Sequence, residues 1–134
     1  MDTNARELVL RQEVYDVVSC AMEVLNVRGH GLNEKVYENC LCIEFRIRNI
    51  PYVQQPRYRV LYKGESAGEY IPDLVVFDKL IVDAKTIERI TPHEHGQMLN
   101  YLRITGHQVG VLLNFKHARL EWERLVLTKP ANSR

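Results

Sequence analysis

The sequence predicts an α/β sandwich in which helices flank one mixed sheet. In the first third of the chain, apolar residues recur every three or four positions, which is typical of amphipathic helices. The middle third carries two short, almost continuous apolar runs, which are typical of buried strands. A capped helical segment then separates these runs from two further strands, so the expected order is two helices, three or four strands, one helix and two strands.

The first third is expected to form two helices. An apolar stripe between Ala5 and Val27 indicates the first helix, and the glycines of the segment 29–31 end it. Asn33 is expected to cap a second helix that stops before Pro51. The apolar faces consist of Val14, Val17, Val18, Ala21, Met22 and Leu25 in the first helix, and of Val36, Tyr37, Cys40 and Leu41 in the second.

After residue 51 the pattern changes to that of strands and turns. Residues 52–54 and 58–62 are predicted strands, followed by a turn at Lys63 and Gly64. The apolar runs 70–77 and 79–84 are expected to be central strands that are covered on both faces.

A third helix is expected to begin at Thr91. Glu94 follows this threonine by three residues, which is the spacing of a capping box, and Pro92 suits the first turn. The helix should run to about Ile104, where Gly106 ends it. The expected last strands are residues 109–115 and 120–127, followed by a frayed tail at 128–134.

Composition favours one domain spanning residues 1–134, with its core at about 10–127. The 134 residues are 46% hydrophobic and 26% charged, which is enough apolar material for one core. No apolar stretch approaches the roughly 20 residues of a membrane span, and the N-terminus lacks a signal-peptide pattern, so we expect a soluble, cytoplasmic protein without a membrane partner. Three cysteines without paired spacing favour reduced thiols over disulfides or structural zinc.

Charge gives no global case for nucleic-acid binding. The 18 Lys and Arg residues nearly cancel the 17 Asp and Glu residues, for a net charge of +1. Any basic surface must therefore be local, and solvated surface charge is the simpler interpretation of both basic groups in the sequence. These groups are Arg46, Arg48, Arg57, Arg59 and Lys63, and then Lys116, His117, Arg119 and Arg124.

Three charged side chains interrupt the two apolar runs. Asp83 and Lys85 are two residues apart in a predicted strand and therefore share a face, and a hairpin would bring Asp73 beside Asp83. Two nearby carboxylates repel each other unless a cation lies between them, and Mg2+ accepts one or two carboxylates together with waters and phosphate oxygens. The alternative is a structural ion pair between Asp83 and Lys85, with Asp73 in an ordinary turn after Pro72.

The motifs around these charges resemble the PD-(D/E)XK nuclease superfamily. Ile71-Pro72-Asp73 with Asp83-Ala84-Lys85 is similar to its signature, and Gly31-Leu32-Asn33-Glu34-Lys35-Val36-Tyr37 is similar to that of its small bacterial GxxExxY branch. The likeness extends through Tyr62-Lys63-Gly64, residues 97–102 and residues 110–115, and so covers roughly residues 10–127. One departure is that the branch usually has Glu-x-Lys where this chain has Asp83-x-Lys85.

The resemblance implies a restriction-endonuclease-like αβββαβ core with an extra N-terminal helix. It further implies that Asp73 and Asp83 hold Mg2+ or Mn2+, that Lys85 serves the attacking water, and that Glu34 is an additional acid on the metal or the water. Glu34 has an alternative structural interpretation, since an acid in the first turn of a helix is favoured by the helix dipole.

The third helix carries a second candidate group. Gln97 and Tyr101 are four residues apart and share a helix face, and they resemble the QxxxY element of RecB-like nucleases, which lines the active site. The alternative is a helix face that packs on the sheet, with Tyr101 as a core residue. His93 and His95 point in different directions on a helix, so a metal ion shared by the two histidines is not expected.

The sequence therefore predicts a nuclease that depends on Mg2+ or Mn2+ and hydrolyses phosphodiester bonds of DNA, with RNA as the less favoured substrate. Catalytic roles fall to Asp73, Asp83, Lys85 and Glu34, and a homodimer would enlarge the surface available to DNA. The competing interpretation is a non-catalytic nucleic-acid-binding or protein-interaction module that retains the nuclease fold. A third is a structural partner in a larger assembly.

Overall fold

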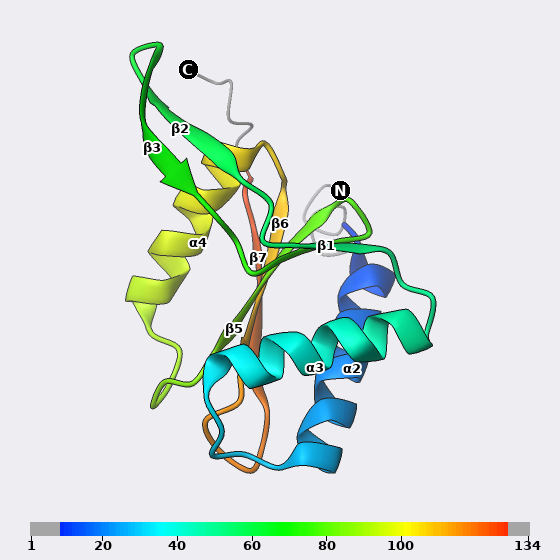
Figure 1. Cartoon of the computed structure of the whole chain (residues 1–134). Coiled ribbons are helices and arrows are strands. Elements are labelled where there is room, and N and C mark those ends of the chain that lie inside the picture. Colours follow the sequence, from blue (N-terminus) through cyan, green and yellow to red (C-terminus); the bar gives the residue numbers. More distant parts are fainter. Residues whose placement is uncertain (1–8, 129–134) are drawn as a thin grey trace, which may run out of the picture.

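The chain folds around a five-stranded mixed sheet, seen in a computed structural model that describes residues 9–128 (Figure 1). The strand order is β1-β4-β5-β6-β7, in which β5 and β6 are parallel and the other neighbours are antiparallel. Strands β2 and β3 form a separate hairpin. The elements are α2 (Arg11–Arg28), α3 (Glu34–Ile47), β1 (Tyr52–Gln54), β2 (Tyr58–Tyr62), β3 (Glu65–Tyr70), β4 (Leu74–Val76), β5 (Leu80–Lys85), α4 (Pro92–Thr105), β6 (Val109–Asn114) and β7 (Glu121–Val126).

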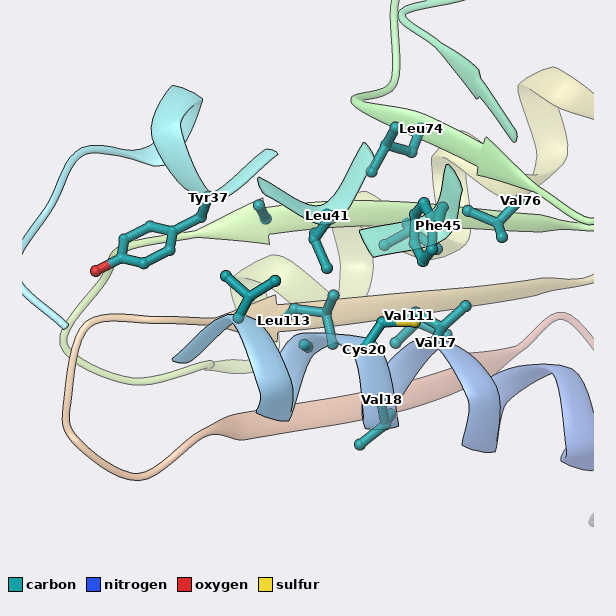
Figure 2. Packing of buried hydrophobic residues seen from close by; sticks show 14 of the residues in the cluster. Val17, Val18, Cys20, Tyr37, Leu41, Phe45, Leu74, Val76, Val111 and Leu113 are labelled. Carbon is teal, nitrogen blue, oxygen red and sulfur yellow. The ribbon is translucent and has the colours of Figure 1, made fainter. Parts of the chain in front are cut away.

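Helices cover both faces of the sheet. Helices α2 and α3 lie on one side, whereas α4 and the β2–β3 hairpin lie on the other (Figure 1). Alternation along β5 separates the two cores, because Val82 and Ala84 join the cluster of α2 and α3 while Ile81 joins that of α4. The larger cluster includes Tyr37, Leu41 and Phe45 of α3, Val17 and Val18 of α2, and Val111 and Leu113 of β6 (Figure 2).

The predicted caps of α3 and α4 are confirmed. The Asn33 side chain accepts a hydrogen bond from the backbone N–H of Val36 at the start of α3. Thr91 and Glu94 form the capping box of α4, and Gly106 closes this helix with a φ of 82° in the left-handed region. Gly110 lets α4 approach β6 closely, because a Cβ atom there would lie 2.4 Å from the sulfur of Met98.

Two predicted boundaries are wrong within the described residues. The first helix begins at Arg11, because Leu10 adopts a left-handed φ of 53°; the part of that prediction before Val9 lies outside the described residues. The apolar run 70–77 is not one strand, because β3 ends at Tyr70 and β4 begins at Leu74. Pro72 lies between them and has no N–H group for a strand ladder. From residue 129 on, the expected tail lies outside the described residues.

Five strands precede α4, rather than three or four. The additional strand is β3, whose sequence is polar and small, and which pairs with β2 across a bulge near Val60 and Leu61. No helix in the described part of the chain is long and apolar enough to cross a membrane.

Candidate functional site

The pairing of β4 with β5 brings the two predicted aspartates together. Leu74 pairs with Val82 in an antiparallel register, so Asp73 and Asp83, one step further along, face each other at the end of the ladder. The backbone N–H of Asp73 donates to Asp83 Oδ1 at 3.2 Å, and the N–H of Ala84 donates to Asp73 Oδ2 at 2.8 Å. The second oxygen of each carboxylate accepts no hydrogen bond from the described residues.

Burial makes this carboxylate pair electrostatically costly. Asp83 is 6% exposed, and desolvation raises its pKa, whereas the hydrogen bond from Asp73 and the charge of Lys85 lower it. Desolvation and the neighbouring charge of Asp83 raise the pKa of Asp73 to about 7. Both carboxyl groups therefore resist ionisation, and a cation bound between them would favour their ionised forms.

Lys85 projects from the same face of β5 as Asp83. It is half-buried at the last position of the strand and pairs in register with Asn114 of β6. Its ammonium group lowers the pKa of Asp83 but makes no hydrogen bond or ion pair of its own with the residues described. The alternative of a structural ion pair between Asp83 and Lys85 is therefore not formed among the described residues, although the charge of Lys85 still acts on Asp83.

Helix α3 adds two acids to the site, one of which the sequence analysis did not single out. Glu34 is exposed in the first turn, and its Oε2 accepts a hydrogen bond from the N–H of Thr86, just after β5, at 3.1 Å. Glu38 lies one turn later and is 4% exposed. The charges of both acids raise the pKa values of Asp73 and Asp83, so all four carboxylates act on one region.

Glu38 is held by side chains from outside its helix. Its Oε2 accepts hydrogen bonds from Gln54 at 2.7 Å, Gln55 at 3.2 Å and Lys35 at 3.2 Å. The four-residue spacing from Glu34 is a sequence signal that places the two acids on the same face of the helix.

The residues of the Gly31–Tyr37 segment have clear structural roles. Gly31 has a φ of 99°, which suits glycine, and the ring of Tyr37 stacks on Phe115 with centroids 4.5 Å apart. The Tyr37 hydroxyl donates to the carbonyl of Gly29 at 2.7 Å and accepts from the N–H of Leu32 at 3.1 Å. Tyr37 thus packs in the core and fixes the loop that presents Glu34.

On α4, Tyr101 and Gln97 have different surroundings. Tyr101 stacks on Tyr70 with ring centroids 3.9 Å apart, and burial together with the charges of Asp83 and Asp73 raises the pKa of Tyr70. Tyr101 thus contacts Tyr70, and Tyr70 in turn is within the electrostatic influence of Asp73 and Asp83. Gln97 is half-buried one turn earlier, but no hydrogen bond joins it to the carboxylates within the described residues.

The remaining polar candidates serve other parts of the fold. His95 Nε2 lies 2.7 Å from a carboxylate oxygen of Glu123 on β7, and His93 is exposed. Asn114, which is 1% exposed, binds the backbone of Ile87 through both ends of its amide and also donates to Glu121. Asn114 thereby fixes the segment that follows Lys85.

The chemistry of these side chains suits a hard divalent cation. The donors are carboxylate oxygens, which Mg2+ and Mn2+ prefer, and each aspartate retains one oxygen without a hydrogen bond. Among residues 9–128, however, no three His, Cys, Asp or Glu side chains are grouped closely enough to hold a metal ion by themselves. The fit is therefore to an ion that takes one or two carboxylates and completes its shell with water or phosphate oxygens.

The mixed sheet, the helices on both faces and the aspartate pair beside a lysine define a restriction-endonuclease-like domain. The family described as the PD-(D/E)XK nuclease superfamily matches residues 11–125. The chain belongs to this superfamily.

A solved structure of similar architecture is the alkaline exonuclease (LHK-Exo) from Laribacter hongkongensis. The two proteins are 12% identical, with a TM-score of 0.47 over 79% of this chain and 75% of that chain. No curated protein matches the sequence.

Proposed function

We propose that this protein is a metal-dependent nuclease that hydrolyses phosphodiester bonds of DNA, with RNA as the less favoured substrate. The observation that carries the proposal is that Asp83 accepts the N–H of Asp73, while Asp73 accepts the N–H of Ala84. The ammonium group of Lys85, on the same face of β5 as Asp83, makes no ion pair with the described residues. Membership of a nuclease superfamily supports the same conclusion. We further propose that the chain belongs to the GxxExxY branch, because Gly31, Glu34 and Tyr37 stand at its three named positions.

Each site residue has a proposed role. Asp73 and Asp83 would hold Mg2+ or Mn2+, which supplies positive charge at the phosphate and makes a bound water more acidic, and Glu34 would be an auxiliary acid that acts on this water. Lys85 orients the attacking water and neutralises charge that develops on the phosphate oxygens. Gln97 and Tyr101 border the substrate. Water adds to phosphorus, and the bond from phosphorus to one sugar oxygen breaks.

Exposed basic residues at this end of the sheet suit a nucleic-acid substrate. Phe115, which follows β6, donates its N–H to the carbonyl of Lys85, so the loop after β6 begins beside the site. Lys116 and Arg119 are exposed on that loop, and Arg89 is exposed on the segment after β5. Cations in these positions can contact phosphates on either side of the scissile bond.

Incubation with single-stranded, duplex and branched DNA and with RNA, each with and without Mn2+, tests the proposal. Wild-type protein should cleave at least one substrate in the presence of Mn2+, whereas Asp83→Ala protein should cleave none. Calorimetry with Mn2+ separates the competing binding module, which would give no heat that depends on Asp73 and Asp83. The homodimer and the cytoplasmic location stay predictions, and light scattering after size-exclusion chromatography would check the former.

A further inference from the structure

Two tyrosines face each other at the base of the β2–β3 hairpin, and their hydroxyl groups have different surroundings. Tyr58 and Tyr70 are direct partners in the antiparallel register. The Tyr58 hydroxyl lies 3.2 Å from His107 Nε2, within hydrogen-bond distance. The Tyr70 hydroxyl is buried and has no hydrogen-bond partner among residues 9–128.

A buried hydroxyl group without a partner is destabilising and rare in native proteins. Packing explains the ring of Tyr70, because it stacks on Tyr101 at an interplanar angle of 15°. Packing does not explain the hydroxyl oxygen, because phenylalanine would stack equally well without leaving an unsatisfied donor. The hydroxyl therefore retains a hydrogen bond to donate, and a ligand that displaces the atoms covering it would accept that bond.

The position of Tyr70 indicates what that partner is. Tyr70 and Tyr101 pack against the cluster that contains Ile81, and Ile81 shares its face of β5 with Asp83, two residues later. The carboxylates of Asp83 and Asp73 both act electrostatically on Tyr70. Tyr70 also lies only three residues before Asp73 in the chain, and the oxygens of a phosphate bound at the two aspartates would be strong acceptors for a hydroxyl donor.

We propose that the Tyr70 hydroxyl donates a hydrogen bond to a phosphodiester oxygen of the nucleic acid that binds at Asp73 and Asp83. This inference rests on the proposed nuclease function. Tyr101 holds the Tyr70 ring against α4, and so fixes the direction of the donor. Tyr70, at the base of the β2–β3 hairpin, would thus contact the substrate directly.

Tyr70→Phe tests the proposal, and Tyr58→Phe is its matched control from the opposite strand. Steady-state cleavage of the best DNA or RNA substrate and thermal unfolding without substrate are measured for both variants and for wild type. Tyr70→Phe should lower kcat/KM roughly tenfold to a hundredfold, because a hydrogen bond to a charged oxygen is lost. Its unfolding temperature should stay equal or rise, because no bond within the folded protein is removed. Tyr58→Phe should cleave like wild type and unfold at the same or a lower temperature.

Three results would overturn the inference. Equal cleavage by Tyr70→Phe and wild type would exclude the substrate contact and leave the nuclease function intact. A Tyr70→Phe variant less stable than Tyr58→Phe would show that the hydroxyl has a structural partner in solution. Failure of wild type to cleave any of the nucleic acids would reject the proposed function, and this inference with it.

Discussion

Asp73 and Asp83 each accept a backbone hydrogen bond from the other's strand segment. Asp83 Oδ1 receives the N–H of Asp73 at 3.2 Å, and Asp73 Oδ2 receives the N–H of Ala84, next to Asp83, at 2.8 Å. These bonds fix both carboxylates before any ligand binds. The folded chain thus holds two carboxyl groups together, one buried and one half-buried, and ionisation of both groups would cost stability unless a cation binds between them.

Asp83→Asn should separate function from stability. The amide oxygen can still accept the N–H of Asp73, while the buried negative charge and its repulsion are removed. We expect loss of metal-dependent cleavage together with an increase of about 1–3 kcal/mol in the free energy of unfolding at pH 8 without divalent ions. Urea unfolding with and without Mn2+ measures both the increase and the loss of stabilisation by the metal.

Asp78→Asn is the control for this change. Asp78 lies in the turn between β4 and β5 with a left-handed φ of 59°, which asparagine adopts readily, and it is exposed. It should leave cleavage and metal-dependent stabilisation unchanged. If Asp83→Asn were less stable than Asp78→Asn in metal-free buffer, Asp83 would be a structural carboxylate and its assignment would be wrong.

The stability of the metal-free protein should fall as the pH rises towards neutrality. The pKa of Asp73 is about 7 in the folded protein against 3.8 for the unperturbed group, so the folded state binds more protons than the unfolded state between these values. The contribution of Asp73 to stability is therefore present below pH 3.8 and is lost progressively as the pH rises through about 7.

Urea unfolding at pH 5, 6, 7 and 8 in the presence of EDTA checks this trend. The same series for Asp73→Asn should have a smaller slope between pH 5 and 8, because one titrating group is removed while Asp83, whose pKa is also raised, remains. Saturating Mn2+ should also flatten the slope, since a cation favours the ionised form. A metal-free wild-type protein that became more stable from pH 5 to pH 8 would contradict the raised pKa of Asp73.

Lys85→Met should abolish or strongly reduce cleavage with little loss of stability. Methionine retains the unbranched apolar stem but not the ammonium group, which makes no ion pair with the described residues. A reduction in kcat of at least about a hundredfold is expected from the loss of a charge at the reacting phosphate. Lys79→Met is the control. Lys79 lies just before the first residue of β5, at the opposite end of the strand from Lys85, and its ammonium group is 3.8 Å from a carboxylate oxygen of Glu13 on α2. Equal kcat values for the two variants would remove Lys85 from the mechanism.

Local patterns in the sequence predicted the parts of the site that depend on local geometry. A strand places Asp83 and Lys85 on one face, and a tight connection between β4 and β5 brings Asp73 opposite Asp83. The capping box likewise depends only on Thr91 and Glu94, which are three positions apart, and it is confirmed. These features follow from contacts between residues at most about ten positions apart.

Tertiary contacts decided what the sequence did not reveal. In the sequence, Glu38 is only a polar residue within an apolar helix face. Its buried carboxylate accepts hydrogen bonds from Gln54 and Gln55, which lie beyond the end of α3. Strand β3 has little apolar sequence and forms because it pairs with β2. The apolar run predicts one strand that contains both Tyr70 and Asp73, whereas Tyr70 ends β3 of the hairpin and Asp73 lies in a bend just before β4 of the larger sheet, with Pro72 between them.

Glu38 and Glu34 should respond differently to substitution. Glu38→Ala should lower the free energy of unfolding by about 1–3 kcal/mol, because the side chains of Lys35, Gln54 and Gln55 lose their common acceptor. Glu38→Gln keeps an acceptor oxygen and removes a charge that opposes ionisation of Asp73, so it should retain both stability and cleavage. Glu34→Gln should fold normally but cleave more slowly, because Glu34 is exposed at the helix start and is the proposed auxiliary acid.

Urea unfolding and initial cleavage rates with Mn2+ distinguish these roles. Glu38→Ala should lower stability, Glu34→Gln should lower only the cleavage rate, and Glu38→Gln should change neither. Exposed Glu23 of α2, changed to Gln, controls for the loss of one negative charge far from the aspartates. Should Glu38→Gln fold normally and lose cleavage while Glu34→Gln keeps it, the buried acid would be the one that serves the reaction. Glu38, rather than Glu34, would then be the auxiliary acid, and Gln54 and Gln55 would position its carboxylate.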